Sequence, residues 1–469
     1  MLRSSLEGSS RSRAIPGGSF EGAASRRHLR MRGGGWDRSL PIPSRFGDRS
    51  MTIAVNPTTA EAGSRPQGVP GPARPATPAH IIRDDAEAIR IAHELANEFR
   101  EGASERDRTN ARPLAELDAF SQSGLWSINV PRAYGGPEVS YKTLAQVIAI
   151  IAAADPSIAQ IAQNHLGIVA AIRTVSDPEQ QALLFADVLK GTRFGNAFSE
   201  RGTKRAAEFE TRFTDHGDHV IVRGQKFYSS GALLAHLVPI VALDAEGRAW
   251  YAIAERDAPG LTVIDDWSAF GQRGTASGTV IIEDVRVEKS HLVPGYRAYE
   301  APRADGAIFQ IIQAAVDAGI GREALDETID FVREKARPWI DSGGERASDD
   351  PYTIRTIGDL TIRQHAAEAL LDRAGLAIDA ALANPTAESV AAAQIAVAEA
   401  KVLTTETALA AANTLFELSG TRSTLAEHNL DRHWRNARTH TLHDPVRWKY
   451  AIIGNHALNG VNPPLHAWS

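Results

Sequence analysis

Two histidines near the C-terminus have the type and spacing that most directly suggest chemistry. The segment RNARTHTLHDP, residues 435–445, places His440 and His443 three residues apart, so a helix would bring them together on one side. Imidazole exchanges protons near neutral pH and suits acid–base catalysis. Asp444 precedes Pro445, and we interpret this short carboxylate as the cap of a following helix rather than as a catalytic base.

A metal site is the alternative explanation for these histidines, because His433 lies in the same segment. The pattern HxxHD without a further cluster of carboxylates is a poor match to known ligand spacings, so we predict no metal. The chain contains no Cys, which excludes disulfides, thiolate nucleophiles and Cys-ligated metals. Any redox chemistry must therefore come from a cofactor.

Composition narrows the possible partners. The chain has 469 residues, 43% of them hydrophobic, which is enough for a large core in two or three domains. The net charge of −6 argues against a nucleic-acid partner, and the absence of a long apolar run argues against a membrane partner. We expect a cytoplasmic protein.

The first residues differ in composition from the rest of the chain. Residues 1–50 contain ten Arg and no Lys among many Ser and Gly, which is typical of a disordered or transit-like arm. Met51 offers a second start, so this arm could be an artefact of start-site choice. We assign residues 1–77 to a disordered leader.

The remainder predicts an α+β protein in which helices and strands are segregated. Residues 78–191 and 299–469 show helical periodicity, while residues 192–298 show short β-branched runs separated by turn residues. We expect strands over residues 219–224, 236–243, 250–255 and 279–287. The order of helices, then strands, then helices, and the lack of a GxGxxG motif, argue against a Rossmann domain.

Ala-rich segments at residues 363–383 and 389–418 carry small side chains on more than one side, which favours burial between neighbouring helices. An ordinary bundle core would explain them equally well.

Separated motifs together resemble the acyl-CoA dehydrogenase superfamily. They are FSERG (198–202), GQKFYSSGALLAH (224–236), DDWSAFGQRGTASG (265–278), ELSGTRST (417–424) and the His-containing segment. The resemblance implies an N-terminal helical domain, a middle β-barrel or sandwich domain and a C-terminal four-helix bundle. It also implies a homotetramer that holds a flavin partly across a subunit interface.

The resemblance implies that one set of residues lies around the flavin ring. These residues are Asn196, Phe198, Ser199, Ser230, Trp267 and His443. We favour Ser230 over Ser229 as the hydroxyl near the reactive edge of the ring. Each has a simpler alternative: a strand-end turn for FSERG, a hydroxyl satisfying a turn for Ser230, and a core position for Trp267.

Cofactor phosphate contacts are expected from Arg337, Arg422 and Ser423, because guanidinium pairs with phosphate oxygens through two parallel bonds. FAD-binding relatives usually have a Gly-rich stretch where this chain has SGTRST. We therefore expect FMN, with FAD as the alternative.

The reaction expected from the resemblance is oxygenation. A dehydrogenase of this superfamily needs a carboxylate base, usually a Glu in a Tyr-Glu-Gly context, but this chain has His443 and Asp444 there and no Glu after them. The His segment resembles the flavin-dependent monooxygenase branch, which includes sulfur-acquisition oxidoreductases and dibenzothiophene monooxygenase. In that branch His443, supported by His440, would stabilise a flavin C4a-hydroperoxide. His165, in QNHLGIVAAI, resembles a histidine of the substrate pocket, although a satisfied core histidine is an equal alternative.

Further segments, among them RPWIDSG, DDPYTI and NPPLHAW, resemble oxidoreductases of the sulfone-utilisation type. We therefore expect a monooxygenase that acts with O₂ on a small sulfone or sulfonate during sulfur acquisition. A separate NAD(P)H:flavin reductase would supply reduced FMN, since the chain lacks a nicotinamide fingerprint. The alternatives are an FAD-dependent acyl-CoA dehydrogenase and a non-catalytic helical assembly protein.

Overall fold

Helices at the N-terminal side begin where capping residues predict. The computed structural model describes residues 68–205 and 208–469, so most of the predicted leader, with Met51, lies outside the described residues. Asp155 and Asp177 cap helices that start with Pro156 and Pro178, a pairing of a capping carboxylate with proline in the first turn that favours a helix start. The helices are α1 (Asp85–Thr109), α2 (Leu114–Gln122), α3 (Tyr141–Ala154), α4 (Pro156–Val175) and α5 (Pro178–Leu189).

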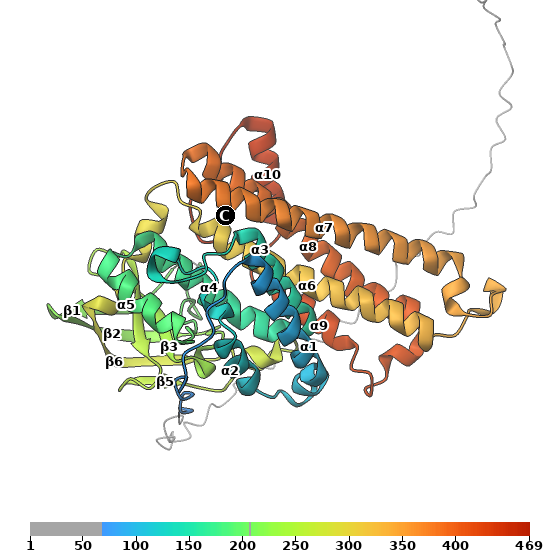
Figure 1. Cartoon of the computed structure of the whole chain (residues 1–469), viewed down its shortest axis with the longest axis horizontal. Helices are drawn as coiled ribbons and strands as arrows, with labels where there is room; N and C mark the ends of the chain where they lie inside the picture. The colour runs from blue at the N-terminus through green and yellow to red at the C-terminus, as the bar shows by residue number, and fades with distance from the viewer. Residues whose placement is uncertain (1–67, 206–207) are drawn as a thin grey trace, which may run out of the picture. The chain divides into compact units, whose positions relative to one another are not determined.

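The middle of the chain forms a mixed sheet, shown in green and yellow in Figure 1. Within the described residues its strand order is β5-β6-β2-β1-β3-β4-β7. The strands are β1 (Arg212–Asp215), β2 (His219–Lys226), β3 (Leu237–Leu243), β4 (Ala249–Glu255), β5 (Leu261–Val263), β6 (Val280–Glu288) and β7 (Leu292–Val293). The predicted middle β-domain is therefore confirmed.

Alternation of side chains explains why β2 and β6 pair as they do. Val220 lies opposite Val287 and Val222 opposite Val285 in the antiparallel register, and all four are buried. The register shifts between Val222 and Gly224, where a β-bulge interrupts the ladder. The strand then continues into the loop that carries Ser229 and Ser230.

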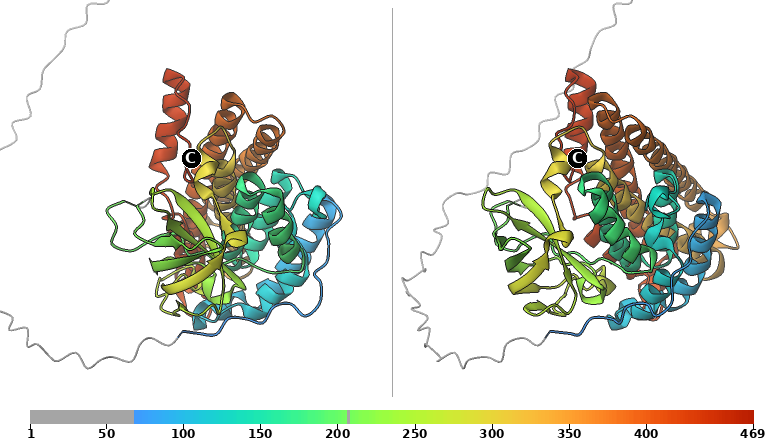
Figure 2. Two further views of the ribbon diagram at one scale, coloured as in Figure 1. Left: turned by 90° about the vertical axis from the view of Figure 1, so that its left-hand side faces the viewer. Right: turned by 60° about the vertical axis from the view of Figure 1, so that its left-hand side comes forward.

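The C-terminal domain is helical, as predicted. Its helices are α6 (Asp305–Glu334), α7 (Pro351–Ala383), α8 (Ala387–Ser419), α9 (Asp431–His440) and α10 (Arg447–Asn459). The long helices α6, α7 and α8 lie side by side, and α10 projects away from the sheet (Figures 1 and 2). Small residues allow this approach: a Cβ at Gly321 would lie 2.8 Å from the Gln364 side chain and 3.2 Å from the Ala408 backbone.

Helix α4 lies between the sheet and the bundle (Figure 1). On the bundle side, α3 packs against α6, where a Cβ at Gly319 would lie 2.3 Å from the Ala149 carbonyl oxygen. Through the part of the chain that the structure describes, no helix has the length and apolarity needed to cross a membrane.

Candidate active site

Helix α4 carries several buried polar side chains, which is costly unless they are bonded or used. Gln160, Gln163, Asn164 and His165 are all less than a tenth exposed. Gln160 contacts α9, while Asn164 and His165 contact the segment that leads into the sheet. This helix is therefore the centre of the candidate site.

His165 is held by the backbone on both sides of its ring. Its Nε2 lies 2.8 Å from the Trp126 carbonyl oxygen, to which it donates, and its Nδ1 accepts from the Phe194 N–H at 2.9 Å. Burial lowers the pKa of His165 to about 3, so the ring is neutral. Both ring nitrogens are used, so this geometry favours the satisfied core histidine over the pocket residue.

His440 ends α9 inside a buried network. Its Nδ1 lies 2.5 Å from Asp317 Oδ1 on α6, and its Nε2 faces the Gln160 side-chain amide at 2.9 Å. Asp317 also accepts from Lys401 Nζ at 2.8 Å and from Thr405 Oγ1 at 2.7 Å. Burial alone would raise the pKa of Asp317, but the larger combined effect of Lys401 and His440 lowers this pKa to about 2. The carboxylate therefore stays ionised and orients the imidazole.

His443 lies just outside this network, with 38% of its side chain exposed. Its Nδ1 is 3.3 Å from Asp444 Oδ1, and Lys449 Nζ is 3.7 Å from the other oxygen of the same carboxylate. Burial raises the pKa of Asp444, but His443, Lys401 and Lys449 together hold it well below its usual range. The interpretation of Asp444 as a helix cap was wrong, because α10 begins at Arg447 without a side-chain cap and this carboxylate instead contacts His443 and Lys449.

Asn196 joins the FSERG segment to α4. Its Nδ2 donates to Asn164 Oδ1 at 2.7 Å, and its Oδ1 accepts from the Phe198 N–H at 2.9 Å. The Phe198 ring stacks on Tyr251 with centroids 5.4 Å apart, so it packs against the sheet. The Ser199 carbonyl accepts from the Phe227 N–H at 3.0 Å, which anchors the segment to the strand end after β2.

A buried hydroxyl cluster contains the predicted Ser230. Its Oγ lies 2.7 Å from Ser277 Oγ, which in turn lies 2.7 Å from Thr275 Oγ1. The neighbouring Ser229 Oγ is buried without a hydrogen-bond partner among the described residues. An unpaired buried hydroxyl is what a bound polar ligand would satisfy.

The loop that carries Trp267 is fastened from two sides. Trp267 Nε1 donates to the Gln272 carbonyl at 2.9 Å, and the Gln272 N–H donates to Asn436 Oδ1 of α9 at 2.7 Å. The indole also lies near Phe227 and Tyr228, with centroids 6.4 and 6.2 Å away. Trp267 is therefore half-buried in an aromatic group held by α9.

Both loops approach the first half of α4. A Cβ at Gly231 would lie 2.8 Å from the Ile161 side chain, and one at Gly274 would lie 3.2 Å from Ser157. The hydroxyl cluster, Asn196 and His440 therefore surround residues 157–164 of one helix.

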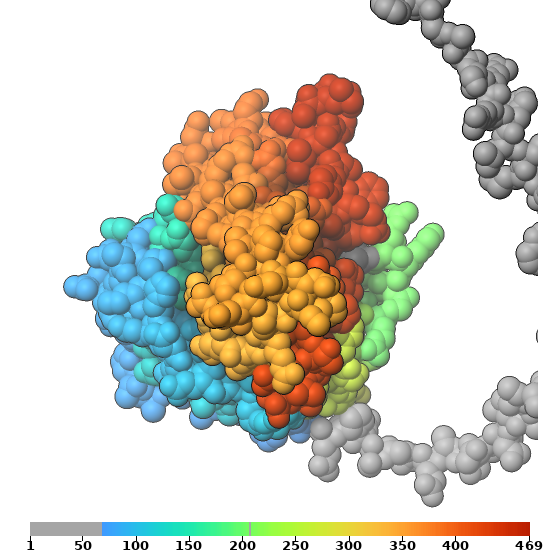
Figure 3. Space-filling view, turned by 90° about the vertical axis from the view of Figure 1, so that its right-hand side faces the viewer, coloured from blue at the N-terminus to red at the C-terminus, as the bar shows by residue number. Residues whose placement is uncertain are grey.

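The predicted phosphate ligands lie elsewhere on the chain. Arg422 Nη1 donates to the Lys335 carbonyl at 3.2 Å, which places the exposed Arg337 and Arg422 together beyond the C-terminal ends of α6 and α8. Figure 3 looks at this end, where the segments after the two helices adjoin. Ser423 Oγ donates to the Gly420 carbonyl. Asp317 and Lys335 are separated by about 27 Å along the axis of α6. Within one chain, these arginines therefore lie far from the residues expected around the flavin ring.

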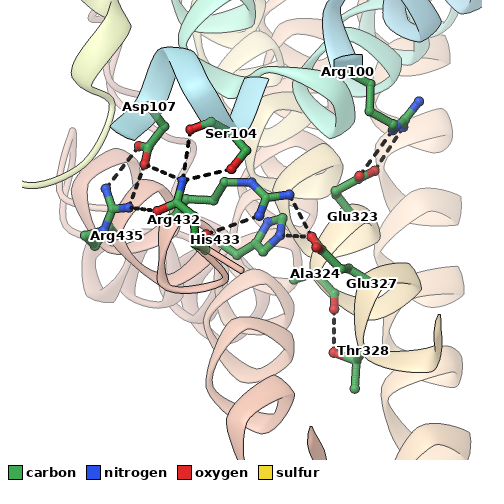
Figure 4. Close-up of polar contacts among 11 residues, drawn as sticks. Arg100, Ser104, Asp107, Glu323, Ala324, Glu327, Thr328, Arg432, His433 and Arg435 are labelled. Carbon is green, nitrogen blue, oxygen red and sulfur yellow. Dashed lines mark hydrogen bonds and ion pairs between the residues drawn. The ribbon is translucent and has the colours of Figure 1, made fainter. Parts of the chain in front are cut away.

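The charged contacts at the start of α9, drawn in Figure 4, were not predicted from the sequence. Arg435 donates to Asp107 of α1 with its two terminal nitrogens at 3.0 and 2.6 Å. Arg432 and His433 both contact Glu327 Oε2 of α6, at 2.7 and 2.5 Å. The basic residues of α9 were visible in the sequence, but Asp107 and Glu327 lie more than a hundred residues earlier in the chain, so no local signal could pair them with α9.

The residues around α4 fit a flavin ring. Such a ring needs a flat apolar wall and a few directed polar groups. The aromatic group at Trp267 offers the wall, while Asn196, Ser230 and the unpaired Ser229 hydroxyl offer polar contacts on neighbouring loops.

Comparison with known proteins agrees with this geometry. The family described as "Acyl-CoA dehydrogenase, N-terminal domain" matches residues 84–192, and "Acyl-CoA dehydrogenase, C-terminal domain" matches residues 311–448. Dibenzothiophene monooxygenase from Rhodococcus erythropolis is 34% identical over 396 residues, covering 81% of this chain and 95% of that protein. The probable FMNH₂-dependent monooxygenase SfnC from Pseudomonas putida is 33% identical over 384 residues, covering 80% and 96%.

Two solved structures are similar throughout their length. FMN-bound TdsC from Paenibacillus sp. A11-2 has a TM-score of 0.78 at 31% identity, covering 81% of this chain and 100% of that chain. Methanesulfinate monooxygenase MsuC from Pseudomonas fluorescens has a TM-score of 0.76 at 33% identity, covering 81% and 99%.

Proposed function

Because the chain belongs to the acyl-CoA dehydrogenase superfamily, in its flavin-dependent monooxygenase branch, we propose that it is a monooxygenase using reduced FMN and O₂. Its substrate is a small organosulfur compound of the sulfone or sulfonate type, oxygenated during sulfur acquisition. The relatives named for dibenzothiophene, for FMNH₂ and for methanesulfinate support this choice.

The observation that carries the proposal is the state of Asp444. A dehydrogenase would need a carboxylate here that accepts a proton, but the contacts of Asp444 with His443 and Lys449 hold its pKa well below the usual range. Such a carboxylate is a poor base. It suits a different task, which is to orient the His443 imidazole.

Bound reduced FMN supplies two electrons, so that one oxygen atom of O₂ enters the substrate and the other leaves as water. In our proposal, His443 holds and delivers a proton from the imidazole edge that faces away from Asp444. His440 is fixed by Asp317 and positions the turn that carries His443. Asn196, Ser230 and Trp267 hold and orient the ring.

Arg337 and Arg422 are well suited to a phosphate but lie far from these residues on the same chain. We therefore assign them to the site of a neighbouring subunit in a homotetramer. The reduced cofactor comes from a separate NAD(P)H:flavin reductase, and this supply, with the absence of Cys, fits a cytoplasmic enzyme.

Turnover with chemically reduced FMN tests this function without the reductase. Photoreduced FMN, protein and oxygenated buffer are mixed with dimethyl sulfone, methanesulfinate or dibenzothiophene, and products are measured by mass spectrometry. We expect an oxygenated product from at least one of them. The opposing result is no product from any, together with reduction of an artificial acceptor by the FAD-loaded protein and an acyl-CoA.

The variant His443→Gln keeps a polar side chain but cannot transfer a proton. We expect product formation to fall about 100-fold, the usual scale for losing an acid–base group, with the Kd for FMN little changed. The exposed His365 of α7 provides the matched control, since His365→Gln should leave both values unchanged. Equal activity of the two variants would contradict the role of His443.

A further inference from the structure

Helix α9 carries two buried polar side chains on one side, Asn436 and, one turn later, His440. Their exposed fractions are 6% and 3%. His440 contacts α4 and α6, whereas Asn436 faces the loop that carries Trp267. One short helix therefore contacts both the network around His440 and the loop expected to lie along the flavin ring.

The hydrogen bond from Asn436 reaches a residue whose backbone connects both groups expected around the ring. Asn436 Oδ1 accepts from the Gln272 N–H at 2.7 Å. The carbonyl of the same Gln272 accepts from Trp267 Nε1 at 2.9 Å and from Thr275 Oγ1 at 2.8 Å. Thr275 belongs to the buried hydroxyl cluster that contains Ser230. A single residue thus joins α9 to the indole and to the hydroxyls.

Gln272 has an uncommon backbone conformation, with a φ of 51° in the left-handed region. Residues other than Gly, Asn and Asp rarely adopt this conformation, and it persists only where the surrounding contacts impose it. The stacked rings of Phe270 and Trp434 also attach the loop to α9, but these side chains are 50% and 39% exposed. The bond from Asn436 is buried, where the loss of a partner costs most.

The two polar atoms of Asn436 have different surroundings. Oδ1 must face Gln272, because an N–H requires an acceptor, while Nδ2 has no hydrogen-bond partner among the described residues. Asn436 also lines a small cavity together with Arg106 and Arg432. An Asp at this position would therefore keep the acceptor, and the two guanidinium groups would offset its charge.

We propose that Asn436 is a positioning residue for oxygenation, because its acceptor bond fixes the loop of Trp267 relative to the histidines that end and follow α9. This inference rests on the proposed function. The His443 N–H donates to the His440 carbonyl at 3.0 Å, so His443 moves with the end of α9. A displacement of about 1 Å between groups that act together can lower a rate about 100-fold.

The variants Asn436→Leu and Asn436→Asp separate positioning from folding. Leucine removes the acceptor at similar size, so we expect kcat to fall at least about tenfold and more of the reduced FMN to yield hydrogen peroxide instead of product. Aspartate keeps the acceptor, so product formation should stay within about twofold of the wild type. A role in folding alone would lower stability and leave the product formed per FMN oxidised unchanged.

Asn429 is the matched control. It is 8% exposed and lies just before α9, but its Nδ2 donates to Ser104 and Asp107 of α1 rather than to the loop. Asn429→Leu should lose stability in denaturation, while the product formed per FMN oxidised stays that of the wild type. Equal losses of product per FMN in the two Leu variants would overturn the inference.

A double-mutant cycle on FMN affinity tests the connection without turnover. Trp267→Phe removes the indole N–H that donates to the Gln272 carbonyl. We expect Asn436→Leu and Trp267→Phe each to raise the Kd for oxidised FMN, measured by flavin fluorescence, about tenfold. The double variant should bind FMN about as weakly as one single variant, because both substitutions act through Gln272.

Two results of the binding measurements would overturn the inference. One is additive losses, with the Kd of the double variant raised about 100-fold. The other is an Asn436→Asp variant that binds FMN as weakly as Asn436→Leu. Neither result depends on oxygenation, so a failure of this inference is distinguishable from a failure of the proposed function.

Discussion

Lys401→Met should be among the most destabilising substitutions in the bundle. The side chains of Lys401 and Asp317 are 1% and 0% exposed, and Nζ lies 2.8 Å from Oδ2. Methionine leaves Asp317 ionised among apolar helices with Thr405 and the neutral His440 as its partners. Removing one member of a buried ion pair costs about 3–5 kcal/mol, a large share of the 5–15 kcal/mol that typically stabilises a domain.

The assay is equilibrium denaturation at fixed protein concentration, followed by circular dichroism and extrapolated linearly to zero denaturant. The double variant Asp317→Asn/Lys401→Met removes both charges, so it should recover about 2 kcal/mol relative to the sum of the single variants. The exposed pair Arg363–Asp359, with side chains 51% and 57% exposed, is the control and should contribute less than about 0.5 kcal/mol. A loss below about 1 kcal/mol for Lys401→Met would refute the reasoning.

Three further perturbations test other parts of the site. Gly271→Ala would place a Cβ 2.0 Å from the Arg435 carbonyl oxygen, so the loop that carries Trp267 must shift. We expect the Kd for FMN, measured by fluorescence, to rise about tenfold. The control Gly358→Ala meets no atom within 4 Å and should leave this Kd unchanged. Acid should destabilise the fold, because the pKa of Asp317 is lowered from 3.8 to about 2 and its contribution, present above pH 3.8, is lost as pH falls through 2. In pH-dependent denaturation, the difference in stability between wild type and Asp317→Asn should narrow as pH falls through this window. A constant difference would argue against it. Arg422→Gln should raise the Kd for FMN about tenfold while leaving that for riboflavin, which lacks the phosphate, unchanged; an equal change for both would remove this arginine from the phosphate site.

The fold was predictable because its signals are local. The strand expected over residues 250–255 is β4 at Ala249–Glu255, and the helix expected over 389–418 is α8 at Ala387–Ser419. Apolar periodicity and turn residues determine both. The short strand β5, Leu261–Val263, escaped notice because three residues are too few to show alternation.

The candidate site was only partly predictable, because its contacts join distant segments. His440 was selected from the sequence, but its partners Asp317 and Gln160 lie more than a hundred residues away in the chain. His165 was selected for its type, whereas its environment is backbone on both sides. Asp444 was assigned as a cap because the sequence does not show that Lys449, on the next helix, contacts its carboxylate.

Buried glutamines show the same limit. Glutamines in a helix usually indicate a solvated face, and nothing in the sequence marks Gln313 as completely buried. Only the packing of α6 against its neighbouring helices shows that this side chain lies inside the protein.

A single-turnover reaction under ¹⁸O₂ tests the central claim most directly. Wild-type protein with one equivalent of photoreduced FMN and excess dimethyl sulfone is mixed with ¹⁸O₂, and product and hydrogen peroxide are quantified. The account predicts one ¹⁸O atom in the product for each productive oxidation of FMN, with His443→Gln diverting the oxygen to hydrogen peroxide. Unlabelled sulfone, with hydrogen peroxide equal to the FMN oxidised and no product from methanesulfinate or dibenzothiophene, would contradict it.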